Sequence, residues 1–351
     1  MNKIHIRASK EYDVLIGRGL FDELGSHAAR VLRGRNVVVV SDSNVAPLYL
    51  GRAVKMLKEA GFTVGSFSFP AGEENKNGNT YLTLLNFLAE KRLTRADALI
   101  ALGGGVVGDL TGFTAATFLR GIACIQVPTT LLACVDSSVG GKTAIDLPAG
   151  KNLAGAFYQP DLVICDPNLI ETLPENVFSD GCAEVIKYGM LGSGELLERL
   201  QARHAKDDLE YVIAKCVDMK REVVEGDEFD TGRRQLLNLG HTLGHAVEAN
   251  SDFTISHGQA VAIGMAMIAE AAVNHGLCTE ETRDEIVSLL RQYGLPTGTA
   301  QSPEQILATA LGDKKRRSDT LTLIVPREVG RCDLYPVPVE ELRDWIQASV
   351  D

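Results

Sequence analysis

Three of the seven histidines in this chain of 351 residues fall between positions 241 and 257. His241 and His245 are four residues apart, so a helix would place both imidazoles on one face. His257 follows a short polar segment and begins an apolar stretch that is typical of a second helix. Neutral imidazole is the commonest metal ligand in proteins, and a catalytic zinc site takes three protein ligands. The spacing predicts a divalent-metal site, with hydrogen-bonded structural histidines as the alternative.

Glu184 is the candidate for a third ligand. It precedes Lys187 by three residues in an otherwise apolar segment, 183–188, which is expected to be helical. Charges are costly to bury without a partner. Either the two residues form an ion pair on the surface, or Glu184 joins two histidines at the metal. Gly240 and Gly244 favour the metal site, because each costs a helix about 1 kcal/mol relative to alanine unless something approaches the backbone closely.

A glycine-rich loop at 103–108 fits the pattern G-x-G-x-x-G, after the apolar segment 98–102 and before a predicted helix. Backbone amides in such a loop can hold a pyrophosphate. The acidic residue that would bind a ribose about twenty positions later is absent, and Asp42, directly after the valine run 37–40, is a candidate for that role. The alternative is a glycine turn that only permits tight packing.

A second candidate anion site spans 136–143, with the sequence Asp-Ser-Ser-Val-Gly-Gly-Lys-Thr. It resembles the end of a P-loop, but the first glycine is missing and no clear strand precedes it. Its hydroxyls, glycines and Lys142 suit an anion, and Lys151 and Asn152 follow soon after. A solvated glycine turn is the alternative. More cations lie near these motifs and indicate a small anionic substrate: Lys220, Arg234, Lys314 and Lys315.

The periodicity of the chain changes near position 174. Before it, apolar strands alternate with amphipathic helices, which is typical of a doubly wound parallel sheet with ligands at the carboxyl ends of its strands. After it, strand patterns disappear and helical periodicity runs almost to the end. We therefore expect an α/β domain at 1–174 and an all-helical domain at 175–351. The expected strands are 4–6, 12–16, 36–41, 63–69 and 98–102, and the expected helices of the first domain include 20–32, 47–61 and 81–91.

Composition excludes several classes of protein. A formal net charge of −11 argues against binding to nucleic acid or to a membrane surface, since both need basic patches. No apolar run is long enough to cross a membrane, and the N-terminus lacks the apolar core of a signal peptide. The seven cysteines are scattered, which is typical of reduced thiols. We expect a cytoplasmic protein.

Several motifs follow one another over nearly the whole chain: 103–109 (GGGVVGD), 127–130 (VPTT), 136–142 (DSSVGGK), 151–152 (KN), 183–187 (AEVIK), 238–245 (NLGHTLGH) and 257–258 (HG). Together and in this order they closely resemble the 3-dehydroquinate synthase family. The resemblance implies a Rossmann-like NAD-binding domain followed by a helical domain that binds metal and substrate. It also implies a homodimer.

The reaction that the resemblance implies belongs to the shikimate pathway of aromatic amino acid biosynthesis. 3-Deoxy-D-arabino-heptulosonate 7-phosphate is converted to 3-dehydroquinate and phosphate by transient oxidation with NAD, β-elimination of phosphate, re-reduction and intramolecular aldol cyclisation. One divalent metal, zinc or cobalt, takes part. The alternatives are another sugar-phosphate cyclase, a metal-dependent polyol dehydrogenase and, from a different class, a non-catalytic metal-stabilised binding protein.

The resemblance also implies roles for single residues. The metal ligands are Glu184, His241 and His257, which leaves His245 for substrate contact and proton relay. NAD contacts are implied for Asp42, Asn44, Glu73, Lys76, Gly105, Val106, Val107, Gly108, Asp109, Thr129, Thr130, Lys142, Lys151, Leu169 and Thr172. Catalytic or substrate contacts are implied for Asp136, Lys142, Asn152, Lys187, Lys220, Arg234, Asn238, His245 and one of Lys314 and Lys315, with Arg120 reaching in from a partner subunit. Two departures from the family pattern are visible, Asp230 in place of glutamate and Cys134 in place of glutamine.

Overall fold

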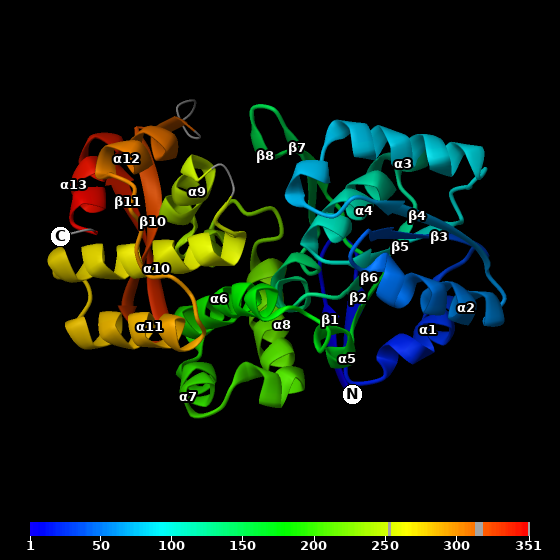
Figure 1. Ribbon diagram of the computed structural model, residues 1–351, viewed down its shortest axis with the longest axis horizontal. Helices are drawn as coiled ribbons and strands as arrows, with labels where there is room; N and C mark the ends of the chain where they lie inside the picture. Colours follow the sequence, from blue (N-terminus) through cyan, green and yellow to red (C-terminus); the bar gives the residue numbers. More distant parts are fainter. Residues whose placement is uncertain (252–253, 313–318, 350–351) are drawn as a thin grey trace. The chain divides into compact units, whose positions relative to one another are not determined.

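The computed structural model describes residues 1–251, 254–312 and 319–349 (Figure 1). Contacts divide the chain into two compact units. Unit 1 comprises Met1–Leu173 and Leu209–Phe229, and unit 2 comprises Pro174–Asp208 and Asp230–Asp351. We predicted a second domain that runs without interruption over 175–351, and the division by contacts differs from this prediction in one segment. Helix α8 (Leu209–Gly226) belongs to unit 1 because it packs against strands β1 and β2.

Unit 1 is built on a seven-stranded sheet with the order β1-β2-β9-β6-β5-β3-β4. Every neighbouring pair is parallel except the β1–β2 hairpin. All six residues of the interior strand β5 are buried, as expected for a parallel strand covered on both faces. The predicted doubly wound sheet is confirmed. Its strands are β1 (Asn2–Ile6), β2 (Tyr12–Ile16), β3 (Asn36–Asp42), β4 (Thr63–Phe69), β5 (Ala98–Gly103), β6 (Ala123–Pro128) and β9 (Leu162–Cys165).

Helices cover both faces of this sheet, with α3 and α4 on one side and α1 and α2 on the other (Figure 1). Consecutive strand residues point to opposite faces. Leu99 therefore packs in one core cluster with Leu84 of α3, while Ile100 packs in the other with Leu24 of α1 and Leu57 of α2. The helices of unit 1 besides α8 are α1 (Leu24–Val31), α2 (Gly51–Glu59), α3 (Gly78–Glu90), α4 (Gly105–Thr117) and α5 (Pro167–Ile170).

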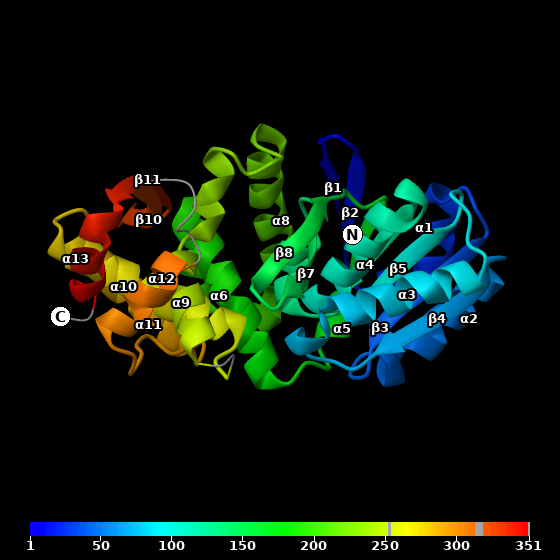
Figure 2. The same ribbon diagram turned by 90° about the horizontal axis from the view of Figure 1, so that it is seen from above.

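A second, two-stranded sheet in unit 1 follows the candidate anion run. Strands β7 (Lys142–Leu147) and β8 (Gly150–Phe157) form an antiparallel hairpin beside α4 (Figure 2). A Cβ at Gly112 of α4 would lie 2.4 Å from Thr143 Cγ2, so only glycine permits this packing. The alternative of a solvated glycine turn is wrong, because Gly140 and Gly141 are buried, with φ angles of 90° and 72°.

Unit 2 is mainly helical, as predicted. Helix α10 is buried along most of its length and packs against α6, α9, α11 and β10. No helix within the described ranges is both long and apolar enough to cross a bilayer. The helices are α6 (Glu175–Gly192), α7 (Gly194–Ala202), α9 (His241–Asn250), α10 (His257–Asn274), α11 (Glu280–Gln292), α12 (Pro303–Gly312) and α13 (Leu342–Gln347).

One prediction for unit 2 is wrong, since it is not all-helical. Strands β10 (Thr320–Glu328) and β11 (Arg331–Pro338) form an antiparallel hairpin around a turn at Gly330, which has a φ of 79°. Leu321 and the four consecutive residues Leu323 to Pro326 of β10 are buried. A short buried apolar run is typical of a strand covered on both faces, and periodicity alone does not distinguish it from a helix.

Candidate active site

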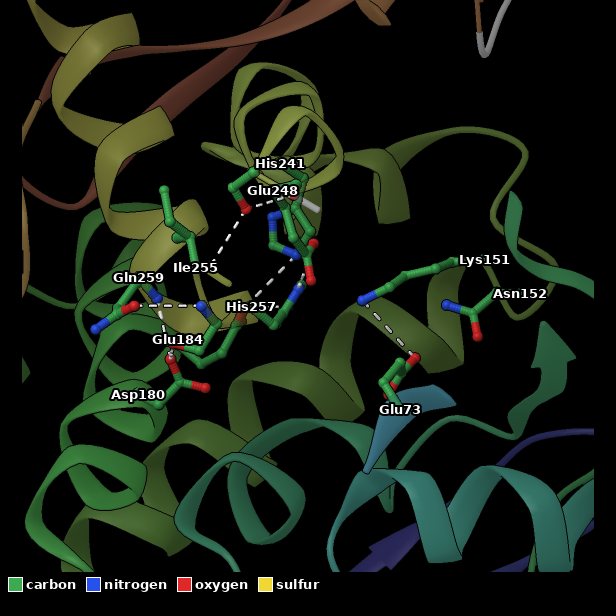
Figure 3. Close-up of polar contacts among 12 residues, drawn as sticks. Glu73, Lys151, Asn152, Asp180, Glu184, His241, Glu248, Ile255, His257 and Gln259 are labelled. Atoms are coloured by element: carbon green, nitrogen blue, oxygen red, sulfur yellow. Dashed lines mark hydrogen bonds and ion pairs between the residues drawn. The ribbon is translucent and has the colours of Figure 1, made fainter. Parts of the chain in front are cut away.

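Three side chains distant in the sequence converge within unit 2. Glu184 lies on α6, His241 is the first residue of α9, and His257 is the first residue of α10 (Figure 3). The Nε2 atoms of His241 and His257 lie 3.6 and 3.5 Å from Glu184 Oε1, and one ligand atom from each residue falls within 4.8 Å of the others. Two imidazoles and one carboxylate are a donor set that fits a divalent metal such as zinc.

The charges around this cluster are buried. Glu184 is fully buried, so the alternative of a surface ion pair with Lys187 is wrong. The pair exists in the interior, where the Lys187 ammonium contacts Glu184 Oε2 while Oε1 faces the histidines. Lys187 and Arg234 are each 1% exposed. Unit 2 therefore keeps two buried cations, one of which directly adjoins the predicted metal ligands.

The two imidazoles differ in their protonation. Burial lowers the pKa of His241 to about 3, and the Lys187 charge adds to this effect against the attraction of Glu184. Its Nδ1 lies 3.0 Å from the Leu239 carbonyl and donates to it, so Nε2 presents a lone pair toward Glu184. Burial also lowers the pKa of His257, but contacts with Glu184 and Glu248 outweigh it and raise the pKa to about 10. A metal bound at His257 would therefore have to displace a proton.

Glycines allow helices α9 and α10 to approach closely enough to bring the two histidines together. A Cβ at Gly240 would lie 2.6 Å from the Val261 carbonyl oxygen, and one at Gly244 would lie 2.6 Å from that of Ala260. The helix-breaking glycines in the histidine motif thus have a structural reason, the close approach of a second backbone. We expected from the cost of glycine in a helix that something approaches the backbone at Gly240 and Gly244, and the structure shows that it is the backbone of α10.

Asp180 lies on α6, one turn before Glu184, and its side chain holds the start of α10. Its Oδ1 accepts hydrogen bonds from the Gln259 amide at 3.0 Å and from the Ser256 hydroxyl (Figure 3). Ser256 and Gln259 also form a capping box at the N-terminus of α10. Helix α6 therefore supplies a predicted ligand and also holds the first turn of the helix that carries His257.

The residues predicted to bind a nucleotide include several at the carboxyl ends of β3, β5 and β6 in unit 1. Helix α4 begins at Gly105, directly after β5, and its first amides point out of the helix end. The Thr129 amide donates to the Gly103 carbonyl at 2.9 Å, which joins the ends of β6 and β5. At the end of β3, Asp42 Oδ1 accepts from the Asn44 amide at 2.8 Å. Tight packing also contributes, because a Cβ at Gly103 would lie 2.5 Å from Val107 Cγ2.

Other predicted nucleotide residues lie near the C-terminal end of the first 174 residues. Thr172 Oγ1 is 2.7 Å from the Tyr49 hydroxyl, and Tyr49 lies in a short helical segment after β3. Leu169 is 2% exposed and packs in a core cluster with residues of β3 and β5. The structure thus gives Leu169 a packing role, and the Thr172 hydroxyl a polar contact at the same end of the sheet.

A buried lysine organises several of the predicted nucleotide and substrate residues. Lys76 Nζ lies 2.7 Å from Glu73 Oε1, 2.8 Å from Asn152 Oδ1, 3.3 Å from Asp109 Oδ2 and 3.7 Å from Asp146 Oδ1. Burial lowers the pKa of Lys76, but the carboxylates outweigh it and raise the pKa overall. Burial raises the pKa of Asp109 to about 6, although the attraction of Lys76 opposes the rise.

Two candidate substrate residues of unit 1, Lys220 and Asp136, contact each other. Lys220 of α8 donates to Asp136 Oδ1 at 2.6 Å and to its carbonyl at 2.7 Å. Lys142 is exposed at the start of β7. Lys151 Nζ lies 3.9 Å from Glu73 Oε1, next to Asn152 (Figure 3).

The remaining predicted site residues lie in different surroundings. Arg120 is exposed, with a φ of 67°, and follows Leu119, with a φ of 51°, so an unusual turn directs it outward. Asn238 lies in the short helix before α9. His245 is exposed on α9, with its ring centroid 5.2 Å from that of His241. Lys314 and Lys315 lie outside the described residues.

Sequence comparisons place the chain among known proteins. The profile described as 3-dehydroquinate synthase N-terminal matches residues 66–180, and that described as 3-dehydroquinate synthase C-terminal matches residues 181–316. The chain is 48% identical to the 3-dehydroquinate synthase of Pelobacter propionicus over 340 residues, which cover 94% of each chain. The enzyme of the same name from Clostridium perfringens strain 13 is 46% identical over 337 residues, covering 94% of this chain and 96% of the relative. The chain belongs to the 3-dehydroquinate synthase family.

A solved structure agrees with the family assignment. The crystal structure of 2-deoxy-scyllo-inosose synthase complexed with carbaglucose-6-phosphate, NAD+ and Co2+ matches with a TM-score of 0.88 and 27% sequence identity. The match covers 98% of this chain and all of that one. The fold of this chain is thus shared with 2-deoxy-scyllo-inosose synthase.

Three residues that contact the predicted site residues were missed by sequence reasoning. Glu248 faces His257, Asp180 caps α10, and Asp146 accepts a 2.8 Å hydrogen bond from the Asn152 amide while its own amide donates to the Lys76 carbonyl at 2.7 Å. Only Glu248 had a sequence signal, since it lies seven positions after His241 and so shares its helix face. The other two depend on tertiary contacts.

The two departures from the family pattern have different surroundings. Cys134 is fully buried and its Sγ lies 3.7 Å from the Pro128 carbonyl, so the thiol packs as a small apolar group. Asp230 has a φ of 58°, a conformation in which aspartate is tolerated better than most residues.

Proposed function

We propose that this chain catalyses the reaction of its family, with the residue roles given below. 3-Deoxy-D-arabino-heptulosonate 7-phosphate is converted to 3-dehydroquinate and phosphate within the shikimate pathway. The observation that carries the proposal is the convergence of Glu184, His241 and His257 in a unit that also buries Lys187 and Arg234. A buried cluster of metal-ligand atoms beside cations suits an anionic substrate that needs a Lewis acid.

Glu184, His241 and His257 hold one divalent metal, zinc or cobalt. When bound, the metal acts as a Lewis acid that lowers the pKa of the substrate's secondary alcohol. The protein contributes the geometry, because the Leu239 carbonyl fixes the His241 ring and Lys187 fixes Glu184 through Oε2. The exposed imidazole of His245, beside His241, is suited to receive or return a proton.

The carboxyl ends of β3, β5 and β6 hold NAD. When bound, NAD accepts a hydride and returns it, which makes the overall reaction redox-neutral. The exposed amides at the start of α4 suit the pyrophosphate. Around this end of the sheet, the residues proposed to contact NAD are Asp42, Asn44, Glu73, Lys76, Gly105, Val106, Val107, Gly108, Asp109, Thr129, Thr130, Lys142, Lys151, Leu169 and Thr172.

Cations hold the substrate's phosphate and carboxylate, so the leaving group is oriented before elimination. The Asp136 carboxylate fixes the Lys220 ammonium at 2.6 Å, and Asn152 is fixed by Lys76 at 2.8 Å. These contacts reduce the freedom that each side chain would lose when substrate binds. The residues proposed to contact the substrate are Asp136, Lys142, Asn152, Lys187, Lys220, Arg234, Asn238, His245 and one of Lys314 and Lys315.

The active form is a cytoplasmic homodimer in which Arg120 acts in the partner's site. The exposed, left-handed turn at Leu119 and Arg120 supports this role, because it directs a cation away from its own unit. Mixing Arg120→Ala with Lys187→Ala subunits should restore activity that each variant lacks alone. No recovery in dimers shown to have exchanged subunits would remove Arg120 from the proposal.

One assay separates this function from its nearest rival, a metal-dependent polyol dehydrogenase. The protein is supplied with the heptulosonate phosphate, the divalent metal and substoichiometric NAD, while phosphate and NADH absorbance are followed together. A cyclase releases one phosphate per product over many turnovers of one NAD, without accumulating NADH. NADH that grows in step with substrate consumption would refute the proposed reaction. A sugar phosphate without the carboxylate serves as the control for another cyclase specificity, and it should turn over much more slowly.

A further inference from the structure

Both ring nitrogens of His257 face a buried carboxylate (Figure 3). Nε2 lies 3.5 Å from Glu184 Oε1, and Nδ1 lies 3.8 Å from Glu248 Oε2. Glu248 is 3% exposed and belongs to α9. We propose that Glu248 is a positioning residue that holds the Nδ1–H side of His257, so that the Nε2 lone pair points to the metal. The inference rests on the metal site proposed above.

The arrangement distinguishes between two possible ligand sets that share His257. One consists of Glu184, His241 and His257, and the other of His245, Glu248 and His257. In the first set, Oε1 of Glu184 is nearly equidistant from two Nε2 atoms, at 3.6 and 3.5 Å. The Leu239 carbonyl already engages His241 Nδ1, so Nε2 is the atom available to a metal. Glu248 approaches His257 from the opposite ring nitrogen and therefore acts behind the ligand.

A buried carboxylate at this place has two effects on an imidazole ligand. It selects the tautomer with the proton on Nδ1, and its charge raises the basicity of Nε2. At 3.8 Å the contact is within ion-pair range but longer than a direct hydrogen bond. The effect is therefore mainly electrostatic in this geometry, and it acts in an interior where screening by solvent is weak.

The turn that ends α9 also links Glu248 to the segment that leads into His257. The Ser251 hydroxyl donates to the Glu248 carbonyl at 2.7 Å and accepts from the Ile255 amide at 3.2 Å (Figure 3). Asp180 holds the next turn through Ser256 and Gln259. The backbone on both sides of His257 is thus fixed independently of the Glu248 carboxylate. Removing only that carboxylate should change the ring's electrostatics and orientation while leaving the backbone in place.

The test measures metal affinity in the metal-free protein, independently of turnover. Apo-protein is titrated with Co2+ against a competing chelator, and the visible absorption of bound cobalt reports the coordination geometry. Glu248→Ala should bind one ion with affinity reduced about 10- to 100-fold, the usual effect of losing such a partner. Glu248→Gln should lose most of the same affinity, because it keeps the shape of the side chain but removes the charge. His257→Ala should lose tight binding.

A matched control is Glu270→Gln, which removes another carboxylate, one that pairs with Arg283 and lies thirteen residues after His257 on the same helix. It should bind cobalt as the wild type does. Wild-type affinity in Glu248→Ala would overturn the inference, and so would loss as complete as that in His257→Ala, since Glu248 would then be a ligand itself. If Glu248→Ala fails to fold, the Glu248→Gln affinity decides in the same way. A wild-type protein that binds no metal would refute the proposed metal site as well as this inference.

Discussion

Each unit contains a buried cluster of charged side chains, and the two clusters differ in the groups that compensate the buried charge. In unit 1, the ammonium of Lys76 lies among the carboxylates of Glu73, Asp109 and Asp146. In unit 2, the carboxylate of Glu184 lies between Lys187 and the nitrogens of two histidines. An ammonium has no lone pair to offer, whereas a neutral imidazole does. The first cluster therefore pairs its cation with carboxylates of its own, and the second offers atoms that could bind an external cation.

The same difference appears in the titration of the two clusters. Burial raises the pKa of Asp109 to about 6, because neighbouring carboxylates add to the effect of burial and Lys76 offsets it only in part. Burial lowers the pKa of His241 to about 3, which keeps its ring neutral and able to bind a metal. We therefore expect unit 1 to respond mainly to loss of its lysine and to pH, and unit 2 to respond mainly to loss of metal ligands.

The largest effect should follow removal of a metal ligand. His241→Ala removes one of the nitrogens that face Glu184, so tight binding of metal should be lost and turnover abolished. Metal content after dialysis is the measurement. His245→Ala is the control on the same helix face, and it should retain one metal per chain while kcat falls about 10²- to 10⁴-fold, as for loss of a proton-transfer group. Stoichiometric metal in His241→Ala, or none in His245→Ala, would contradict the assignment of ligands.

A large effect on stability should follow removal of the central cation of unit 1. Lys76→Met leaves the nearby carboxylates without their buried partner, so the free energy of unfolding should fall by about 3–5 kcal/mol. Denaturant unfolding of the metal-free protein measures this change. Lys151→Met is the control, since the Lys151 side chain is 28% exposed and lies 3.9 Å from Glu73. It should cost less than about 1 kcal/mol. Equal losses in the two variants would show that burial does not strengthen the Lys76 contacts.

The sequence predicted the parts of the fold in which local pattern and tertiary environment agree. The valine run before Asp42 and the apolar run at 98–102 became buried parallel strands because both faces of the sheet are covered. The hairpin at Thr320–Glu328 and Arg331–Pro338 was missed, since Pro326, Pro336 and Pro338 are unusual in strands. The mostly apolar run 321–325 was the sequence signal for a strand at this place.

The sequence predicted those residues of the candidate site whose side-chain type itself indicates a chemical role. Histidine spacing pointed to a metal, and the family resemblance selected Glu184, His241 and His257, which the fold brings together. The supporting residues were harder to predict. Asp180 lies 76 positions before the Ser256 hydroxyl that it contacts. Asp146 supports Asn152 only because a hairpin folds back upon itself. Such contacts depend on packing between elements, which no local spacing encodes.

A smaller effect is expected for Asp109, whose titration should make the stability of unit 1 depend on pH. The folded protein holds the Asp109 proton up to about pH 6, whereas the unfolded chain releases it near pH 4. Between these values the folded state binds more protons, so the free energy of unfolding falls as pH rises. The contribution is about 2 kcal/mol after allowance for partial exposure. Asp109→Asn removes it, so the variant should gain stability over the wild type from pH 4 to pH 7.

Urea unfolding at pH 4, 5, 6 and 7 measures this difference. Asp13→Asn provides a control of opposite sign. Burial raises the Asp13 pKa, but Lys3 and His5 outweigh it and lower the pKa overall. Its ionised form therefore stabilises the fold at higher pH, and removing it should make the variant less stable than the wild type as pH rises through 4. If the free energy of unfolding depends on pH in the same way for the wild type and Asp109→Asn, Lys76 must compensate the Asp109 charge completely. The expected pH response of unit 1 would then be wrong.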